Sequence, residues 1–530
     1  MSFAFEQSPD QVLARLQTWR QADSPTAGGR ILAYVFDTGV AELDRLAARA
    51  AQAMLPVNGL DPVAFPSTAR LEREVVAFVR DLAGGHGGRG DDAVVGAATT
   101  GGTESNLLAV KTARDLYLDR PDRPTDRPKL VLPTTAHGSF RKAAHYFGLA
   151  VDLAPTAADG LVDPAAVIAR LGEDVALVVA SAPAYPFGGL DPVAAVAAAA
   201  WERGLPCHVD ACMGGLSFPF WPGAEDLPAW DFRLPGVTSL SLDLHKFGFA
   251  PKGVSVLLQR GRARQRRQFS ACADWAGYPL VGSTMLGSKS ACSLAAAWAI
   301  ICALGRPGFA RLTAQTARAA AAIAERVEAI EGLRVFSRPT GPMLALAADP
   351  RVAPDRRVDP HHWADALRAL GWTAQLQPGL AQADGPRLPP TAHLTATPVT
   401  ESRLPQLLPA LARAADQTRG RPPADGAALR SRLEATAGWD PTGPPDAWWA
   451  AWERLAADRA AETADARVGP TASDQTTTTT SDTNTDLTTD DVAGGAGGPG
   501  QADWLALLEA LPARQAESLL IGRLASLAEA

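Results

Sequence analysis

Lys246 is the residue of this chain whose surroundings point most directly to chemistry. It stands in the segment SLSLDLHKFG, residues 239–248, at the end of an apolar run and among small and aromatic neighbours. Burial disfavours the charged form of a lysine and lowers the pKa of its amine. A neutral amine is a nucleophile that can form a Schiff base with a carbonyl group. The segment therefore makes Lys246 a candidate catalytic lysine, although by itself a structural role explains it as well.

Three other segments place polar residues at comparable positions. In TTGGTES, residues 99–105, glycines precede a helix-like segment, and the amides of a helix start suit a phosphate. His137 follows the apolar run 130–133, and Asp210 ends the run 208–210. Singly, these residues are explained as a helix start, a core histidine and a turn cap. Together with Lys246 they supply a phosphate cradle, a ring-stacking imidazole, a carboxylate and a Schiff-base amine, the set that pyridoxal phosphate requires.

A mostly parallel sheet would bring these residues together. Short apolar runs alternate with helix-like segments, notably 104–118, 164–170 and 192–201. The runs are 94–98, 130–133, 177–180, 208–210, 237–242 and 254–258. This alternation predicts an α/β fold with helices on both faces of the sheet. Ligands of such sheets bind at the carboxyl ends of the strands, where the four segments lie.

Composition divides the rest of the chain and excludes several classes. We expect an N-terminal helical segment (1–90), a large cofactor-binding domain (91–305), a small α+β domain (306–436), a Trp-rich helix (437–464), a disordered Thr/Asp/Gly-rich linker (465–501) and a Leu-rich C-terminal helix (502–530). The last helix either returns to the core or docks on a partner.

The net charge of −7 gives no strong field for nucleic acid or an anionic membrane. No apolar stretch approaches the roughly 20 residues of a membrane span, and no secretory signal is visible. Five cysteines without a CxxC pair predict neither disulfides nor a metal site and suit the cytoplasm. No P-loop or dinucleotide fingerprint is present, which disfavours a nicotinamide enzyme.

The chain resembles the group II pyridoxal-phosphate-dependent decarboxylase family, and within it the sphingosine-1-phosphate lyase-like branch. The resemblance runs from about Gly29 to Pro398. It rests on GGTES at 101–105, TAH at 135–137 with KAAHYFG at 142–148, HVDAC at 208–212 and SLSLDLHKFGFAPKG at 239–253. It implies an aspartate-aminotransferase-like fold (fold type I), pyridoxal 5'-phosphate as cofactor, and a homodimer with active sites at the interface.

The resemblance also implies a role for each matching residue. Lys246 would carry the Schiff base, Asp210 would pair with the pyridinium nitrogen, and His137 would stack on the ring. The contacts to the cofactor phosphate would come from Gly102, Thr103 and His245, and from Ser283 of the neighbouring subunit. Lys252 also matches the family, with its role left open.

Several positions depart from the pattern of the lyases. Phe36 replaces a tyrosine, with Tyr34 two residues away, and Asp61 and Phe187 each replace a histidine. Thr284, in the segment aligned with Gly-Ser-Arg, replaces an arginine. An acid in place of a histidine and a neutral residue in place of an arginine both disfavour a phosphate dianion.

We therefore expect a carbon–carbon lyase that decarboxylates an amino acid or related amine, with no nucleic-acid or membrane partner. Two alternatives remain open. One is an aldehyde-lyase that cleaves an amino alcohol phosphate by a retro-aldol reaction. The other is a pyridoxal-phosphate-binding scaffold without turnover.

Overall fold

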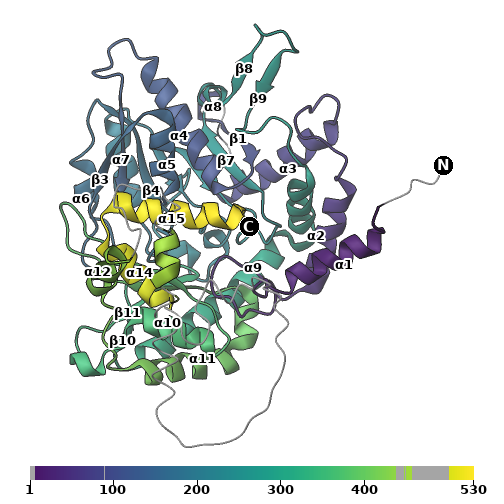
Figure 1. Ribbon diagram of the computed structural model, residues 1–530. Coiled ribbons are helices and arrows are strands. Elements are labelled where there is room, and N and C mark those ends of the chain that lie inside the picture. Colours follow the sequence, from purple (N-terminus) through teal and green to yellow (C-terminus); the bar gives the residue numbers. More distant parts are fainter. Residues whose placement is uncertain are drawn as a thin grey trace, which may run out of the picture.

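A seven-stranded sheet forms the centre of the larger part of the molecule (Figure 1). The computed structural model describes residues 6–86, 88, 90–436, 447, 449–455, 457 and 500–529. In order across the sheet, the strands are β1 (Val94–Thr99), β7 (Ser255–Arg260), β6 (Val237–Leu242), β5 (Cys207–Asp210), β4 (Val175–Ser181), β2 (Lys129–Pro133) and β3 (Ala150–Ala154). β7 runs antiparallel to both neighbours, and all other pairs are parallel. Six strands of this sheet therefore end at the same edge.

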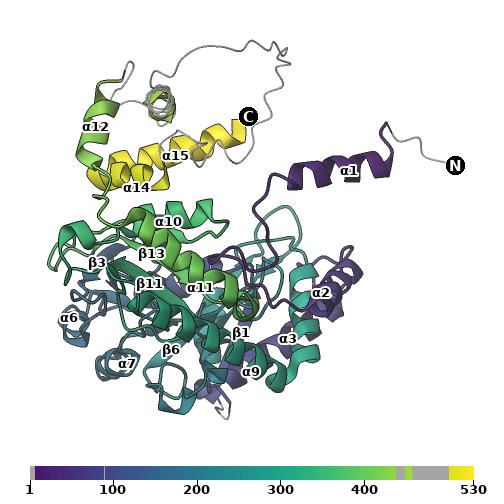
Figure 2. The same ribbon diagram turned by 90° about the horizontal axis from the view of Figure 1, so that it is seen from below.

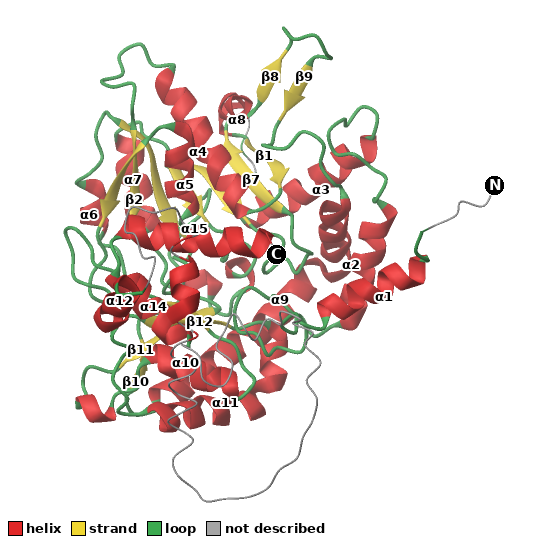
Figure 3. Ribbon diagram, viewed as in Figure 1, coloured by secondary structure: helices red, strands yellow, loops and turns green. Residues whose placement is uncertain are grey.

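Helices cover both faces of the sheet, as Figure 3 shows. Side chains of a strand alternate between its two faces. In β4, Leu177 and Val179 pack with α4 (Gly102–Leu118) and α5 (Ser139–Phe147), whereas Val178 packs with α7 (Val193–Glu202). The helices α6 (Pro164–Ile168) and α8 (Arg262–Gln268) pack beside α7 and α4 respectively. The prediction of a mostly parallel α/β sheet is thus confirmed.

The apolar runs located all but one of the strands of this sheet. The exception is the edge strand β3, whose sequence AVDLA carries an aspartate and is only partly buried. The hairpin of β8 (Ser270–Cys272) and β9 (Leu280–Gly282) was not predicted either, because its strands are three residues long and largely exposed. The described 3-10 helices are η1 (Gly90–Asp92), η2 (Phe218–Phe220), η3 (Ala224–Asp226) and η4 (Pro354–Arg356).

A second, antiparallel sheet follows in the chain. Its order is β10 (Leu333–Val335), β11 (Met343–Ala348), β13 (Thr391–Thr395) and β12 (Gln375–Gln377). The helices α10 (Pro360–Ala369) and α11 (Pro398–Thr418) pack with it around Trp363 and Trp372, which are almost fully buried. These elements form the smaller α+β part of the fold.

The long helix α9 (Cys292–Glu328) connects the two parts of the fold. It bends at Gly305, whose backbone has φ 52°, two residues before Pro307. By length and composition α9 could cross a membrane. It packs instead on α2 (Ala41–Ala53), α3 (Pro66–Leu82) and α11, as a core helix does.

The two ends of the chain extend from this body (Figure 2). α1 (Pro9–Arg20) stands away from it and has no buried residue. At the other end, α12 (Gly426–Glu434), α14 (Gln501–Ala510) and α15 (Ala513–Glu529) gather beside α10. Of the expected Trp-rich helix, the described Trp449 and Trp452 pack on Trp504. The expected linker 465–501 lies, apart from its last two residues, outside the described residues.

Candidate active site

A cavity of about 550 Å³ opens at the carboxyl edge of the large sheet. Six of the seven residues predicted for the site line it: Gly102, Thr103, His137, Asp210, His245 and Lys246. They follow or end β1, β2, β5 and β6, whose carboxyl ends meet at this edge. The parallel arrangement thus brings together residues that are up to 144 positions apart, from Gly102 to Lys246.

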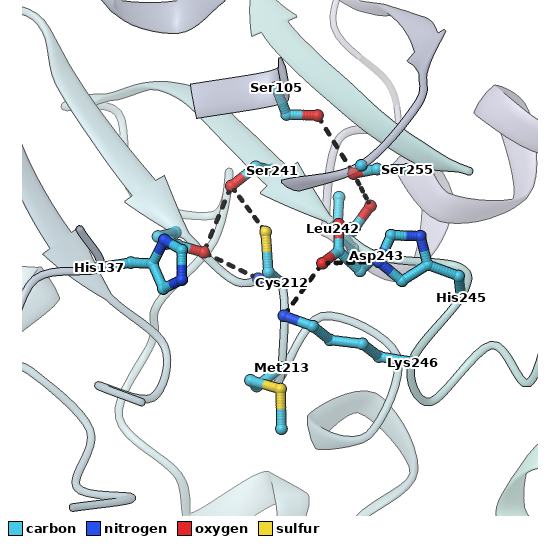
Figure 4. A network of polar contacts seen from close by, with 12 residues as sticks. Ser105, His137, Cys212, Met213, Ser241, Leu242, Asp243, His245, Lys246 and Ser255 are labelled. Atoms are coloured by element: carbon cyan, nitrogen blue, oxygen red, sulfur yellow. Dashed lines mark hydrogen bonds and ion pairs between the residues drawn. The ribbon is translucent and has the colours of Figure 1, made fainter. Parts of the chain in front are cut away.

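Lys246 forms an ion pair within the cavity. Its Nζ lies 3.0 Å from Asp243 Oδ2, and His245 Nε2 lies 3.4 Å from the same oxygen (Figure 4). Burial by itself lowers the pKa of the Lys246 amine, but the Asp243 carboxylate more than offsets this and raises the pKa above its ordinary value. The prediction of a lowered pKa is therefore wrong for the chain alone, because it considered burial and not this carboxylate.

Asp210 is held in place as a hydrogen-bond acceptor. Its carboxylate accepts hydrogen bonds from Asn106 Nδ2 at 3.2 Å and from the backbone amide of Cys212 at 3.1 Å. Burial lowers the pKa of the neighbouring His208 to about 4, so that ring is neutral at pH 7. The negative charge of Asp210 is thus not matched by His208 and is available to a protonated ring nitrogen of a ligand.

His137 is oriented by the same network. Its Nδ1 lies 2.9 Å from Ser139 Oγ and accepts a hydrogen bond from the backbone amide of Ser139 at 3.3 Å. Ser139 Oγ in turn accepts from Asn106 Nδ2 at 2.9 Å. Asn106 therefore connects the imidazole to Asp210. Sequence reasoning missed this residue, although it directly follows the GGTES motif.

Two glycines at the start of α4 leave room beside the cavity. A Cβ on Gly102 would lie 2.6 Å from Cys212 Sγ and 2.9 Å from both Asp243 carboxylate oxygens. A side chain there would therefore crowd the residues that hold Lys246. The free amides of a helix start bind anions, and the first turn of α4 lines the cavity. This donor set, with Lys246 and Asp210, fits pyridoxal phosphate: Gly102, Thr103 and His245 would hold its phosphate.

Gly102→Ala is expected to lower stability by about 1–3 kcal/mol, as overpacking does, and to weaken retention of pyridoxal phosphate. The matched control is Gly138→Ala, because a Cβ at Gly138 meets nothing within 4 Å and its φ of −57° suits alanine. Thermal unfolding and cofactor content after dialysis measure both effects. Equal behaviour of the two variants would contradict a cradle at Gly102.

Ser283, the seventh predicted residue, does not line the cavity of the single chain. It lies in the loop after β9, where its carbonyl accepts from Gln268 Nε2 at 2.7 Å. Its assigned contact needs a neighbouring subunit and stays a prediction.

A second Gly-Ser pair, Gly287-Ser288, is followed by Lys289 and precedes α9, and Asn58 Nδ2 donates to Ser288 Oγ at 3.1 Å. If the family's Gly-Ser-Arg is aligned with this second segment, Lys289 stands at the position of the arginine and the positive charge is kept. The sequence analysis did not consider this alignment.

The four positions that depart from the lyase pattern, and Tyr34 beside one of them, also lie outside the cavity lining. Phe36 packs edge-on to Phe247, with the Nζ of Lys252 4.6 Å from its ring centre. Asp61 accepts from the amides of Val63 and Ala64 as a turn residue. Tyr34 is exposed, Phe187 packs on Phe336, and Thr284 donates to the carbonyl of Leu286. Within one chain, these positions therefore do not select against a phosphate.

Tyr185 lines the cavity and was not predicted. Its hydroxyl donates to Gln375 Oε1 at 2.5 Å, and its ring stacks on His393 at 4.6 Å. Burial raises the pKa of the Tyr185 phenol to about 12. The apolar run 177–180 indicated the chain after β4 but not this residue of it, which comes four positions beyond the end of the strand. Lys142 and Tyr146 of α5 also line the cavity.

The class of protein follows from the fold, this site and the comparisons. The pyridoxal-dependent decarboxylase conserved domain matches residues 35–345, so the chain belongs to that family. Membership confirms fold type I and pyridoxal 5'-phosphate as the cofactor. Within the family, the chain belongs to the sphingosine-1-phosphate lyase-like branch.

Three similar proteins illustrate this placement. Sphingosine-1-phosphate lyase of Dictyostelium discoideum is 36% identical over 296 residues, which are 55% of this chain and 54% of that protein. A probable L-aspartate decarboxylase of Pyrococcus furiosus is 31% identical over 333 residues, 62% of this chain and 85% of that protein. The solved sphingosine-1-phosphate lyase of Burkholderia pseudomallei has a TM-score of 0.70 and 32% identity, covering 79% of this chain and 93% of that one. The match spans about half of the curated Dictyostelium lyase.

Proposed function

We propose that this chain is a pyridoxal-phosphate-dependent carbon–carbon lyase that decarboxylates an amino acid or a related amine. The convergence of Lys246, Asp210 and His137 on one cavity beside the start of α4 carries the proposal. When bound, pyridoxal phosphate accepts the electron pair that is left when a bond to the amine-bearing carbon breaks. Binding, orientation and proton transfer are the tasks of the chain's own residues.

Each of these residues has a distinct task. Lys246 would hold the cofactor, and its free amine carries a proton at Nζ because Asp243 raises its pKa. Such an ammonium group can protonate a substrate carbon as a general acid. Asp210 would hold a proton at the ring nitrogen through its negative charge. His137, oriented by Ser139, would stack on the cofactor ring and help to hold it.

The hydrogen-bonding states of Tyr185 and His137 in the cavity favour decarboxylation over retro-aldol cleavage. Loss of carbon dioxide needs an acid to protonate the carbon, whereas retro-aldol cleavage also needs a base for the substrate hydroxyl. The raised pKa keeps the Tyr185 phenol protonated. The Ser139 amide donates to His137 Nδ1, so the lone pair of that nitrogen is occupied. The phenol gives its one proton to Gln375 Oε1, and His137 Nδ1 accepts from Ser139, so neither group presents a free base to a substrate hydroxyl.

Product analysis tests this proposal. The holoenzyme is incubated with amino acids and with phosphorylated amino alcohols, and released carbon dioxide and aldehyde are measured. We expect carbon dioxide from an amino acid and no aldehyde. Release of aldehyde without carbon dioxide would contradict decarboxylation. It would favour the second candidate, an aldehyde-lyase, which is supported by the similarity to proteins named sphingosine-1-phosphate lyase.

We further propose that the chain acts as a homodimer in the cytoplasm. The family resemblance supports a dimer, and so does α1, whose exposed Val12, Leu16 and Trp19 lack a covering surface in one chain. The five cysteines are all free, which is compatible with a reducing compartment. Light scattering of the purified protein tests the dimer, and a monomeric mass at working concentration would contradict it.

A further inference from the structure

Helix α5 presents a cation to the same cavity that holds Lys246. Lys142 and Tyr146 both line this cavity. They are four residues apart, so their side chains share one face of the helix. Lys142 Nζ lies 5.4 Å from the centre of the Tyr146 ring, and both side chains are exposed to solvent. The ammonium group is thus placed over an aromatic ring at the solvent side of the cavity.

Lys246 and His245, which also line the cavity, are paired with a carboxylate. Both pair with Asp243, at 3.0 and 3.4 Å. Glu104 accepts hydrogen bonds from the backbone amides of Thr100 and Met285, each at 2.6 Å. Among the described residues that line the cavity, Lys142 is the cation that pairs with no carboxylate. An anion that enters the cavity therefore meets one ammonium group that no carboxylate neutralises.

We propose that Lys142, with Tyr146 beside it, is a subsite for an anionic group that the substrate carries in addition to its reacting amine. This inference rests on the proposed function and deepens it. An ammonium group binds carboxylate or phosphate through charge-assisted hydrogen bonds. Leu107, Met285 and Leu286 add apolar wall to the cavity, which suits methylene groups between the two polar ends. The substrate class is thus a short amine with a carboxylate or phosphate at its far end.

Matched pairs of amines test the subsite. The pairs are glutamate with glutamine, aspartate with asparagine, and O-phosphoethanolamine with ethanolamine. The concentration of each that gives half of the change in cofactor absorption is measured on the holoenzyme. We expect the anionic member of a pair to bind roughly 10- to 100-fold more tightly, the size of a charge-assisted hydrogen bond. The amino acid pairs and the phosphate pair distinguish a carboxylate from a phosphate.

Variants of α5 assign this preference to Lys142. Lys142→Met is expected to remove the preference by weakening the anionic member alone, and Lys142→Arg is expected to keep it. Arg141→Met is the control, because Arg141 is an exposed cation next in the chain that does not line the cavity. It should leave both members unchanged.

The outcomes separate the subsite from the proposed function. Equal binding of both members in the wild type, or an equal loss for both in Lys142→Met, overturns the subsite and leaves the proposed function intact. A spectrum that responds to no amine overturns the proposed function, and the subsite with it.

Discussion

Lys246→Ala is expected to abolish the Schiff-base absorption of the bound cofactor and to reduce turnover beyond the roughly 10²- to 10⁴-fold attributed to a single general acid or base. Lys246 is the amine that both holds the cofactor and transfers a proton in this account. It lies at the carboxyl edge of the sheet in the same cavity as Asp210 and His137. Absorption spectra of the purified variant with added pyridoxal phosphate measure the first effect, and product formation measures the second.

The alanine variant also removes the ammonium partner of the buried Asp243 and leaves it beside the His245 ring; breaking a buried ion pair destabilises a protein by about 3–5 kcal/mol. Lys246→Arg separates this effect from the chemistry. Its guanidinium keeps the positive charge beside Asp243, but its very high pKa prevents it from acting as a nucleophilic amine. A folded arginine variant without Schiff-base absorption is the expected result. Full activity in either variant would refute the role of Lys246.

Asp210→Asn is expected to retain the cofactor on Lys246 while turnover falls on the order of 10²-fold or more, the loss seen when one preorganised electrostatic partner is removed. An amide has the shape of the carboxylate but lacks the charge that keeps a proton on the ring nitrogen. Cofactor content and single-turnover rates measure the two effects separately.

Ser241→Ala provides the comparison for this variant. Ser241 Oγ lies 3.5 Å from Asp210 Oδ1, so its removal disturbs the surroundings of the carboxylate but keeps its charge. We expect a much smaller loss of turnover than in Asp210→Asn. Similar losses in the two variants would show that packing around Asp210, and not its charge, matters for turnover.

The residues that follow the strands could be predicted because their position depends on topology alone. His137, Asp210 and Lys246 each lie at the carboxyl end of a parallel strand, and those ends share one edge. Near-continuous apolar runs marked the strands, since both faces of the sheet are buried. The sequence therefore predicted the sheet and the cofactor-binding core of the site together.

The residues that line the cavity from turns and helix faces could not be predicted in the same way. Tyr185 reaches the cavity through the irregular chain after β4, and Lys142 through the rotation of α5 about its axis. Neither is visible in a pattern of apolar runs. The raised pKa of Lys246 was missed because it depends on how close the Asp243 side chain comes, and not on burial alone. The role predicted for Ser283 would need a second copy of the chain.

Reduction with borohydride, followed by peptide mapping, tests the central claim most directly. The holoenzyme is treated before and after addition of an amine that changes its absorption. The account predicts a pyridoxyl group on Lys246 before addition, and loss of that label when the amine has displaced the lysine. A label on another lysine, or a protein that stays colourless with added pyridoxal phosphate, would contradict it.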